Sequence, residues 1–128
     1  MKSPRLAHVL VFAKDLPKMQ AFYEKAFELT AEPTTDPGFV VLRAKDGAGI
    51  ALHALPQEIA ASFETKSPPD FREETCLKAC FEVSELDAQR QRIVACGGQA
   101  KPPWEWAGTR FAECADPEGK VLQIYQAR

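Results

Sequence analysis

Only a few side chains of this sequence could take part in chemistry. The chain has two histidines, His8 and His53, and both lie in apolar, strand-forming segments. Imidazole is a common metal ligand and acid–base group, but a single histidine in a strand is more often a structural residue whose hydrogen bonds are satisfied. The sequence contains no nucleophile motif, phosphate-binding loop or dinucleotide fingerprint.

The four cysteines, at positions 76, 80, 96 and 114, include no CxxC pair. They fall in segments expected to be strands or a helix. We therefore expect buried, reduced thiols in a cytoplasmic protein.

Two tryptophans stand close together, at Trp104 and Trp106. Residues two apart in an extended chain point to the same side, so the two rings share a face. Large rings at the mouth of a cavity can stack on a planar ligand. Packing at a dimer interface explains the pair equally well, and the sequence leaves both interpretations open.

The composition narrows the class of protein. The 128 residues form one expected domain, 1–128, with 45% hydrophobic residues, 27% charged residues and a net charge of −2. This composition is that of an ordinary globular protein. The sequence has no basic stripe of the kind found in nucleic-acid-binding proteins, so we expect no nucleic-acid partner. No apolar run approaches the roughly 20 residues that span a membrane.

A duplicated pattern of elements positions these residues. Residues 6–55 align with 76–125 at an offset of 70 without a gap, and several shared residues are turn-forming Gly and Asp. In each half a strand is followed by a helix and three short strands. The first module, 6–55, has strands near 6–13, 29–33, 39–45 and 49–55, and a helix from the Asp15 cap to Phe27. The second, 76–127, has strands near 77–83, 99–101, 109–115 and 120–127, and a helix between Ser84 as its cap and Gly97. Residues 56–75 are the expected linker.

Three local motifs resemble one known family. Residues 8–16 resemble its opening strand and helix cap, and residues 21–27 resemble the end of its first helix. Residues 108–111 and 116–123 resemble its closing hairpin. The family is the vicinal oxygen chelate (glyoxalase/bleomycin-resistance/dioxygenase) superfamily. The resemblance implies an α+β fold, in which two βαβββ modules form a curved eight-stranded mixed sheet with helices on the convex face. It also implies a homodimer and a cavity lined by the concave face.

The resemblance implies which residues line that cavity. Its ligand positions fall on His8, His53, Lys78 and Gln123, and the offset of 70 relates them in pairs. Strand alternation adds other side chains to the same face. The predicted ligand-binding residues are His8, His53, Lys78, Gln123, Trp104, Trp106, Tyr125 and Phe12.

A metal site would have to use His8, His53 and Gln123. The fourth position is Lys78, whose ammonium group cannot be a ligand and repels a cation. The carboxylate usual in the last strand is also missing, so hard cations would bind poorly. We therefore expect no resident cofactor, and the alternative is a divalent Zn, Ni, Mn or Fe ion at these residues.

Lys78 leaves three roles open: an ion pair with Glu82 or exposure to solvent, binding of an acidic ligand, or catalysis as a base or nucleophile. We expect Arg110 to pair near Asp116, and Asp116 to hold the last turn. The sequence favours a small-molecule-binding protein with a degenerate metal site, whose ligand is planar or acidic. The alternative is a metal-dependent lyase, isomerase or dioxygenase that uses His8 and His53.

Overall fold

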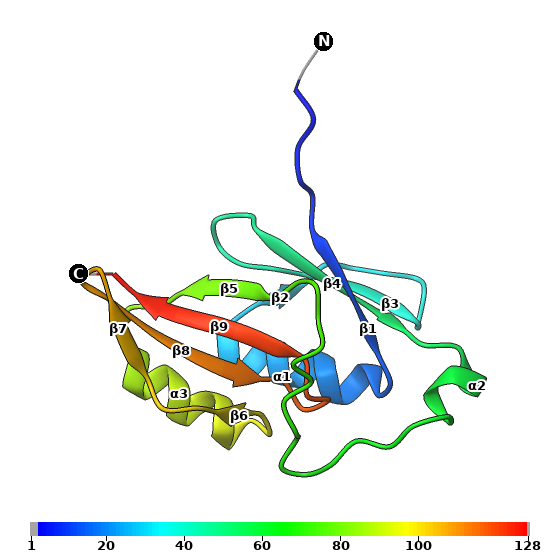
Figure 1. Ribbon diagram of the computed structural model, residues 1–128. Helices are drawn as coiled ribbons and strands as arrows, with labels where there is room; N and C mark the ends of the chain where they lie inside the picture. Colours follow the sequence, from blue (N-terminus) through cyan, green and yellow to red (C-terminus); the bar gives the residue numbers. More distant parts are fainter. Residues whose placement is uncertain (1–2, 128) are drawn as a thin grey trace. The chain divides into compact units, whose positions relative to one another are not determined.

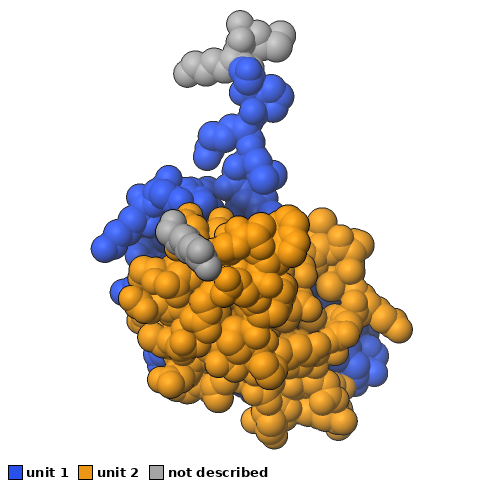
Figure 2. Space-filling view, turned by 60° about the vertical axis from the view of Figure 1, so that its left-hand side comes forward, with its two compact units in different colours: residues 1–63 blue, residues 64–128 orange. Residues whose placement is uncertain are grey.

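The chain divides into two compact units, each built on one copy of the repeated pattern (Figures 1 and 2). A computed structural model describes residues 3–127. Unit 1 comprises residues 1–63 and unit 2 residues 64–128. The predicted α+β fold with two βαβββ modules is confirmed, and its strands are divided between two mixed sheets. Among the described residues, no helix has the length and apolar character needed to cross a membrane.

Unit 1 contains a four-stranded sheet in the order β1-β4-β3-β2. Its elements are β1 (Val9–Ala13), α1 (Leu16–Phe27), β2 (Thr30–Ala31), β3 (Phe39–Arg43), β4 (Gly49–Ala54) and α2 (Gln57–Ala60). β1 runs parallel to β4, and the other pairs are antiparallel. The predicted cap of α1 is confirmed, because the Asp15 carboxylate accepts a hydrogen bond from Lys18 N–H at 3.1 Å.

One face of the unit 1 sheet packs against α1. The helix contacts β3 and β4, and its apolar side chains recur at helical spacing, so they form one buried stripe. The buried residues of this layer are Met19, Phe22, Tyr23, Val40, Leu42, Ile50 and Leu52. Because strand side chains alternate, the remaining side chains point to the opposite face. We call that side the helix-free face of the unit.

Unit 2 repeats this arrangement with one additional strand. Its elements are β5 (Ala79–Glu82), α3 (Leu86–Ala95), β6 (Gln99–Ala100), β7 (Trp104–Trp106), β8 (Thr109–Ala115) and β9 (Val121–Gln126). The sheet order is β5-β9-β8-β6, and β7 pairs with β8. The strand β7 carries both tryptophans and was not predicted. The core of unit 2 consists of Leu86, Ile93, Ala112, Cys114, Leu122 and Ile124.

The start of α3 differs from the prediction. The residue before the helix is Glu85 rather than Ser84, and no side chain of that residue caps it. Instead, Leu86 N–H donates to the Gln126 side-chain oxygen at 2.7 Å. The free N–H groups of a helix start can be satisfied by any nearby acceptor, and here β9 supplies it from the far end of the module.

The predicted linker 56–75 is attached to both units. Its first part forms α2, and Lys14 Nζ donates to the Ala60 carbonyl and, at 2.6 Å, to the Phe63 carbonyl. Its second part lies along the last turn of unit 2, where Arg72 N–H donates to the Gly119 carbonyl at 2.7 Å. The boundary between the units falls between these two attachments.

The gap-free offset of 70 is correct for the first strand and helix of each module but wrong for the last strands. Val9 pairs with Ile50, whereas its counterpart Ala79 pairs with Leu122, so the offset there is 72. The extra residues lie in the segment that forms β7. The structural counterpart of Gln123 is therefore Ala51.

Candidate functional site

The helix-free face of unit 1 carries a row of aromatic rings. The side chains of Phe12, His53 and Phe39 lie next to one another on β1, β4 and β3. Ring centroids are 5.9 Å apart for Phe12 and His53, and 6.1 Å apart for His53 and Phe39. His8 contacts the same Phe39 ring at 6.4 Å. Three predicted residues of this unit, His8, Phe12 and His53, thus share one face.

The two imidazoles have different hydrogen-bond environments. His53 Nδ1 lies 2.8 Å from the Ala54 carbonyl oxygen. The carbonyl oxygen can only accept, so Nδ1 is the donor in this contact. His8 Nδ1 is buried and has no hydrogen-bond partner among the described residues. Both rings pack edge-on against Phe39.

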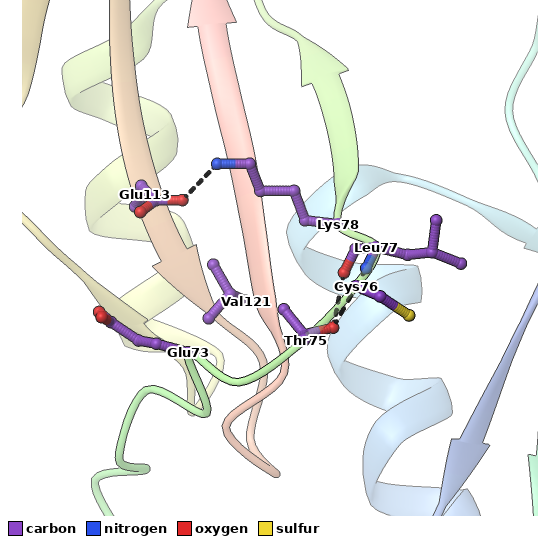
Figure 3. Close-up of a pocket in the computed structure, with 7 residues that line it drawn as sticks. All are labelled: Glu73, Thr75, Cys76, Leu77, Lys78, Glu113 and Val121. Carbon is purple, nitrogen blue, oxygen red and sulfur yellow. Dashed lines mark hydrogen bonds and ion pairs between the residues drawn. The ribbon is translucent and has the colours of Figure 1, made fainter.

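In unit 2 one face of the sheet packs against α3, and the opposite, helix-free face carries a polar row. In register across β5, β9 and β8 are Cys80, Gln123 and Glu113. Lys78 Nζ reaches across β9 to Glu113 Oε2 at 2.7 Å (Figure 3). The Cys80 thiol lies 3.9 Å from the side-chain oxygen of Gln123. Lys78 therefore pairs with Glu113, and not with Glu82, the partner named in one of the three roles that the sequence left open.

A hollow lies beside this ion pair. Its volume is about 290 Å³. It is lined by Glu73, Thr75, Cys76, Leu77, Lys78, Glu113 and Val121 (Figure 3). Lys78 and Glu113 are partly exposed to solvent. They form the charged edge of the hollow, so a ligand there would meet both signs of charge.

Next to the polar row runs a line of side chains that crosses four strands. Glu82 on β5 is in register with Tyr125 on β9, which is in register with Phe111 on β8, and Phe111 pairs with Trp104 on β7. Trp104 and Phe111 are stacked, with centroids 5.3 Å apart and planes at 16°. The ring centroids of Phe111 and Tyr125 are 6.2 Å apart. We call Trp104, Phe111 and Tyr125 the aromatic row.

The second tryptophan continues the same face. Trp106 is in register with Thr109 and is 70% exposed. Trp104 is 42% exposed. The prediction that the two rings share a side is therefore consistent with the register of β7 and β8. Trp104 belongs to the aromatic row, whereas no ring contact joins Trp106 to it among the described residues.

Asp116 and Arg110 of unit 2 have structural roles. The Asp116 carboxylate accepts hydrogen bonds from the Glu118 and Lys120 N–H groups at 2.9 and 3.0 Å, which confirms its role in the last turn. Arg110 does not pair near Asp116. It binds both oxygens of Asp87 on α3, at 3.2 and 3.3 Å, and this hydrogen bonding lowers the pKa of Asp87.

The cysteines are not all buried, so that expectation is wrong. Cys76 and Cys80 are exposed, Cys96 is intermediate, and all four thiols are free. Cys114 alone is buried, under α3, and burial raises its pKa to about 12. Cys80 is exposed because it alternates with Phe81 and points to the helix-free face.

Three important residues were missed from the sequence: Phe39, Phe111 and Glu113. Phe39 lies on β3, opposite His53 of β4. Phe111 and Glu113 lie on β8, opposite predicted residues of β9. The signal that could have found them is the register of each hairpin. Alternation along the strand 109–115 places Phe111 and Glu113 on one face.

The residues present do not fit a bound divalent metal. Three or more ligands are usual for such an ion, and residues 3–127 contain no group of three His, Cys, Asp or Glu side chains arranged to hold one. Glu113, the carboxylate nearest to Gln123, already binds the Lys78 ammonium. In unit 1 both imidazoles pack against the ring of Phe39.

Comparison with solved structures shows the same fold in several proteins. A glyoxalase/bleomycin resistance protein/dioxygenase family enzyme from Burkholderia phytofirmans PsJN is 22% identical. The match covers 95% of this chain and 98% of that one, with a TM-score of 0.73. The fosfomycin resistance protein FosX from Listeria monocytogenes, solved with Mn(II) and sulfate, is 19% identical. That match covers 99% of this chain and 93% of FosX, also with a TM-score of 0.73.

A third similar structure is the bleomycin resistance determinant encoded on transposon Tn5. It is 18% identical over 98% of this chain and 99% of that chain, with a TM-score of 0.66. Identities this low establish a shared fold rather than a shared activity. A search of curated protein sequences finds no match.

The sequence profile of a protein family provides the assignment. Residues 8–125 match the glyoxalase-like domain. The match begins at His8, just before β1, and ends at Tyr125 in β9, so it covers both βαβββ modules. The chain therefore belongs to the glyoxalase-like domain family, and it shares its fold with the glyoxalase/bleomycin resistance protein/dioxygenase family enzyme described above.

Proposed function

We propose that this protein binds a small planar molecule on the helix-free face of unit 2, and that binding needs no metal ion. The observation that carries the proposal is the aromatic row of Trp104, Phe111 and Tyr125. Its rings lie on three adjacent strands, and Trp104 is 42% exposed. A planar ligand can stack on such rings at little conformational cost to the protein.

The polar row beside the rings supports a defined orientation for the ligand. Ligand sites typically combine apolar contact area with a few polar groups that fix orientation. Here the polar groups are the Gln123 amide and the pair of Lys78 and Glu113. Because Glu113 balances the charge of Lys78, the ion pair gives little support to the acidic ligand expected from the sequence.

The alternative from the sequence is a metal-dependent lyase, isomerase or dioxygenase. FosX from Listeria monocytogenes was solved with Mn(II), but within residues 3–127 of this chain no three His, Cys, Asp or Glu side chains are grouped to hold a metal ion. Metal analysis of the purified protein separates the two functions. A stoichiometric Zn, Ni, Mn or Fe ion that is lost in a His53→Ala variant would contradict metal-free binding.

Fluorescence of Trp104 tests the proposed function. A Trp106→Phe variant leaves Trp104 as the only tryptophan. We expect acridine to quench its emission saturably after treatment of the protein with a chelator. A Phe111→Ala substitution should weaken binding roughly three- to tenfold, because it removes the central ring of the row. The matched control is Phe39→Ala, which removes the ring at the corresponding position of unit 1 and should leave the affinity unchanged. Linear quenching without saturation would contradict the proposal.

We also propose that the protein is a cytoplasmic homodimer. β1 is an edge strand of its sheet, and its Val9, Leu10 and Phe12 side chains are 41–51% exposed. Exposed apolar side chains on an edge strand favour association with a second chain. Four free thiols suit a reducing compartment.

A further inference from the structure

We infer that the ligand of the aromatic row is a planar organic cation, such as a protonated or quaternised nitrogen heterocycle. This inference rests on the proposed function and adds the charge of the ligand. The observation behind it is the carboxylate of Glu82, which continues the aromatic row on β5, the strand next to β9.

Glu82 is available to a ligand. It is exposed and in register with Tyr125 on the adjacent strand. Side chains paired in this way have Cβ atoms about 5 Å apart, so the carboxylate lies beside the Tyr125 ring. Among residues 3–127, the Glu82 side chain has no hydrogen-bond or ion-pair partner.

Four cations of unit 2 are each paired with a carboxylate. Lys78 binds Glu113 on the helix-free face itself, and Arg110 binds Asp87 of α3. Lys101 and Lys120 bind Glu73 and Glu118. An anionic ligand would have to displace one of these carboxylates, whereas a cationic ligand meets the unpaired carboxylate of Glu82.

The aromatic row favours the same charge. The faces of aromatic rings carry negative electrostatic potential, so a cation placed over them gains roughly 0.5–2 kcal/mol. A planar cation with delocalised charge can stack on the rings and also approach a carboxylate. Trp104 stacks on Phe111 and is itself 42% exposed, so a planar cation can extend the stack from the Trp104 end.

Three probes with one ring system test the inference: N-methylacridinium, acridine and acridine-9-carboxylate, which are cationic, neutral and anionic at mildly alkaline pH. Each is titrated into the Trp106→Phe protein with Trp104 emission as the readout. We expect N-methylacridinium to bind about three- to tenfold more tightly than acridine, and the carboxylate to bind most weakly. Equal affinities, or tightest binding of the carboxylate, would overturn the inference but leave the proposed function intact. Failure of all three to bind would overturn both.

Two charge variants locate the origin of the preference. Glu82→Gln should weaken the binding of N-methylacridinium more than that of acridine, and the preference that remains comes from the ring faces. Lys78→Gln should raise the affinity for the cation by about two- to fivefold, because it releases the Glu113 carboxylate. Glu64→Gln makes the same change of charge in a residue that belongs to no strand. If Glu64→Gln alters the preference as much as Glu82→Gln does, the preference does not come from Glu82 and the inference fails.

Discussion

At the scale of single residues, two cysteines of unit 2 lie on opposite faces of its sheet, Cys80 on the edge strand β5 and Cys114 on β8. Cys80 lies on the helix-free face and is exposed, whereas Cys114 points beneath α3 and is fully buried. A thiolate is the reactive form of cysteine, and an apolar environment disfavours it. The strand position therefore determines the reactivity of each thiol.

This difference gives a direct chemical prediction. Burial raises the pKa of Cys114 to about 12, so at mildly alkaline pH its thiol stays protonated and inaccessible. We expect iodoacetamide to modify Cys76 and Cys80 in the folded protein and to leave Cys114 unmodified, as read by peptide mass spectrometry. All four cysteines should react in urea. Modification of Cys114 as rapid as that of Cys80 would contradict the burial of Cys114 in the core of unit 2.

Individual site residues were predictable only where alternation could be applied. His8, Phe12 and His53 share a face as the period of two required. Glu113 was missed because its position depends on which residue of β8 lies opposite Gln123. Register of this kind depends on where the turn of the hairpin falls. The ion pair of Lys78 could not be derived from the spacing of residues alone.

At the scale of elements, the sequence predicted the order of strands and helices. It did not predict which residues of the last strands correspond between the two modules. The helix of each module begins within a residue or two of its predicted start, because apolar spacing and Asp15 mark it. The strand β7 was not predicted, since the two tryptophans lie between Pro103 and Gly108. Missing it led to the gap-free offset, which makes Gln123 the counterpart of His53. The structure places Tyr125 there.

The turns of the two last hairpins provide a matched pair of substitutions. Gly47 and Gly119 both have positive φ, of 91° and 85°. A Cβ at Gly47 meets nothing within 4 Å, whereas at Gly119 it would lie 2.2 Å from the Asp70 carbonyl oxygen. We expect Gly47→Ala to lower the free energy of unfolding by about 1 kcal/mol through backbone strain. Gly119→Ala should cost roughly 3 kcal/mol or more, because the chain at 70–72 must move. Equal losses in urea denaturation would contradict the docking of residues 70–72 on this turn.

The end of α1 offers a stabilising substitution. Glu28 has φ 55° at the C-terminal cap, a left-handed conformation that glycine adopts without strain. We expect Glu28→Gly to raise the free energy of unfolding by about 0.5–1 kcal/mol, as measured by urea denaturation. Lys25→Gly, within the same helix, is the control and should lower it by about 1 kcal/mol. Destabilisation by Glu28→Gly would mean that Glu28 makes contacts worth more than the strain.

At the scale of the whole molecule, the proposed dimer depends on the exposed edge strand of unit 1. Light scattering should give a mass twice the 14.2 kDa of the chain. Phe12→Asp should raise the dissociation constant of the dimer at least tenfold, since buried aromatic contacts dominate many interfaces. Ile59→Asp, at a side chain of similar exposure on α2, is the control. A protein that is monomeric at micromolar concentration would contradict the proposal.

The central claim is that a planar ligand binds this protein without a metal. Isothermal titration calorimetry of acridine tests it most directly, first with chelator-treated protein and then with the same protein supplied with excess Mn(II). The account predicts the same dissociation constant in both titrations, because the rings of Trp104, Phe111 and Tyr125 bind the ligand. Binding that appears only after Mn(II) is added would contradict the account.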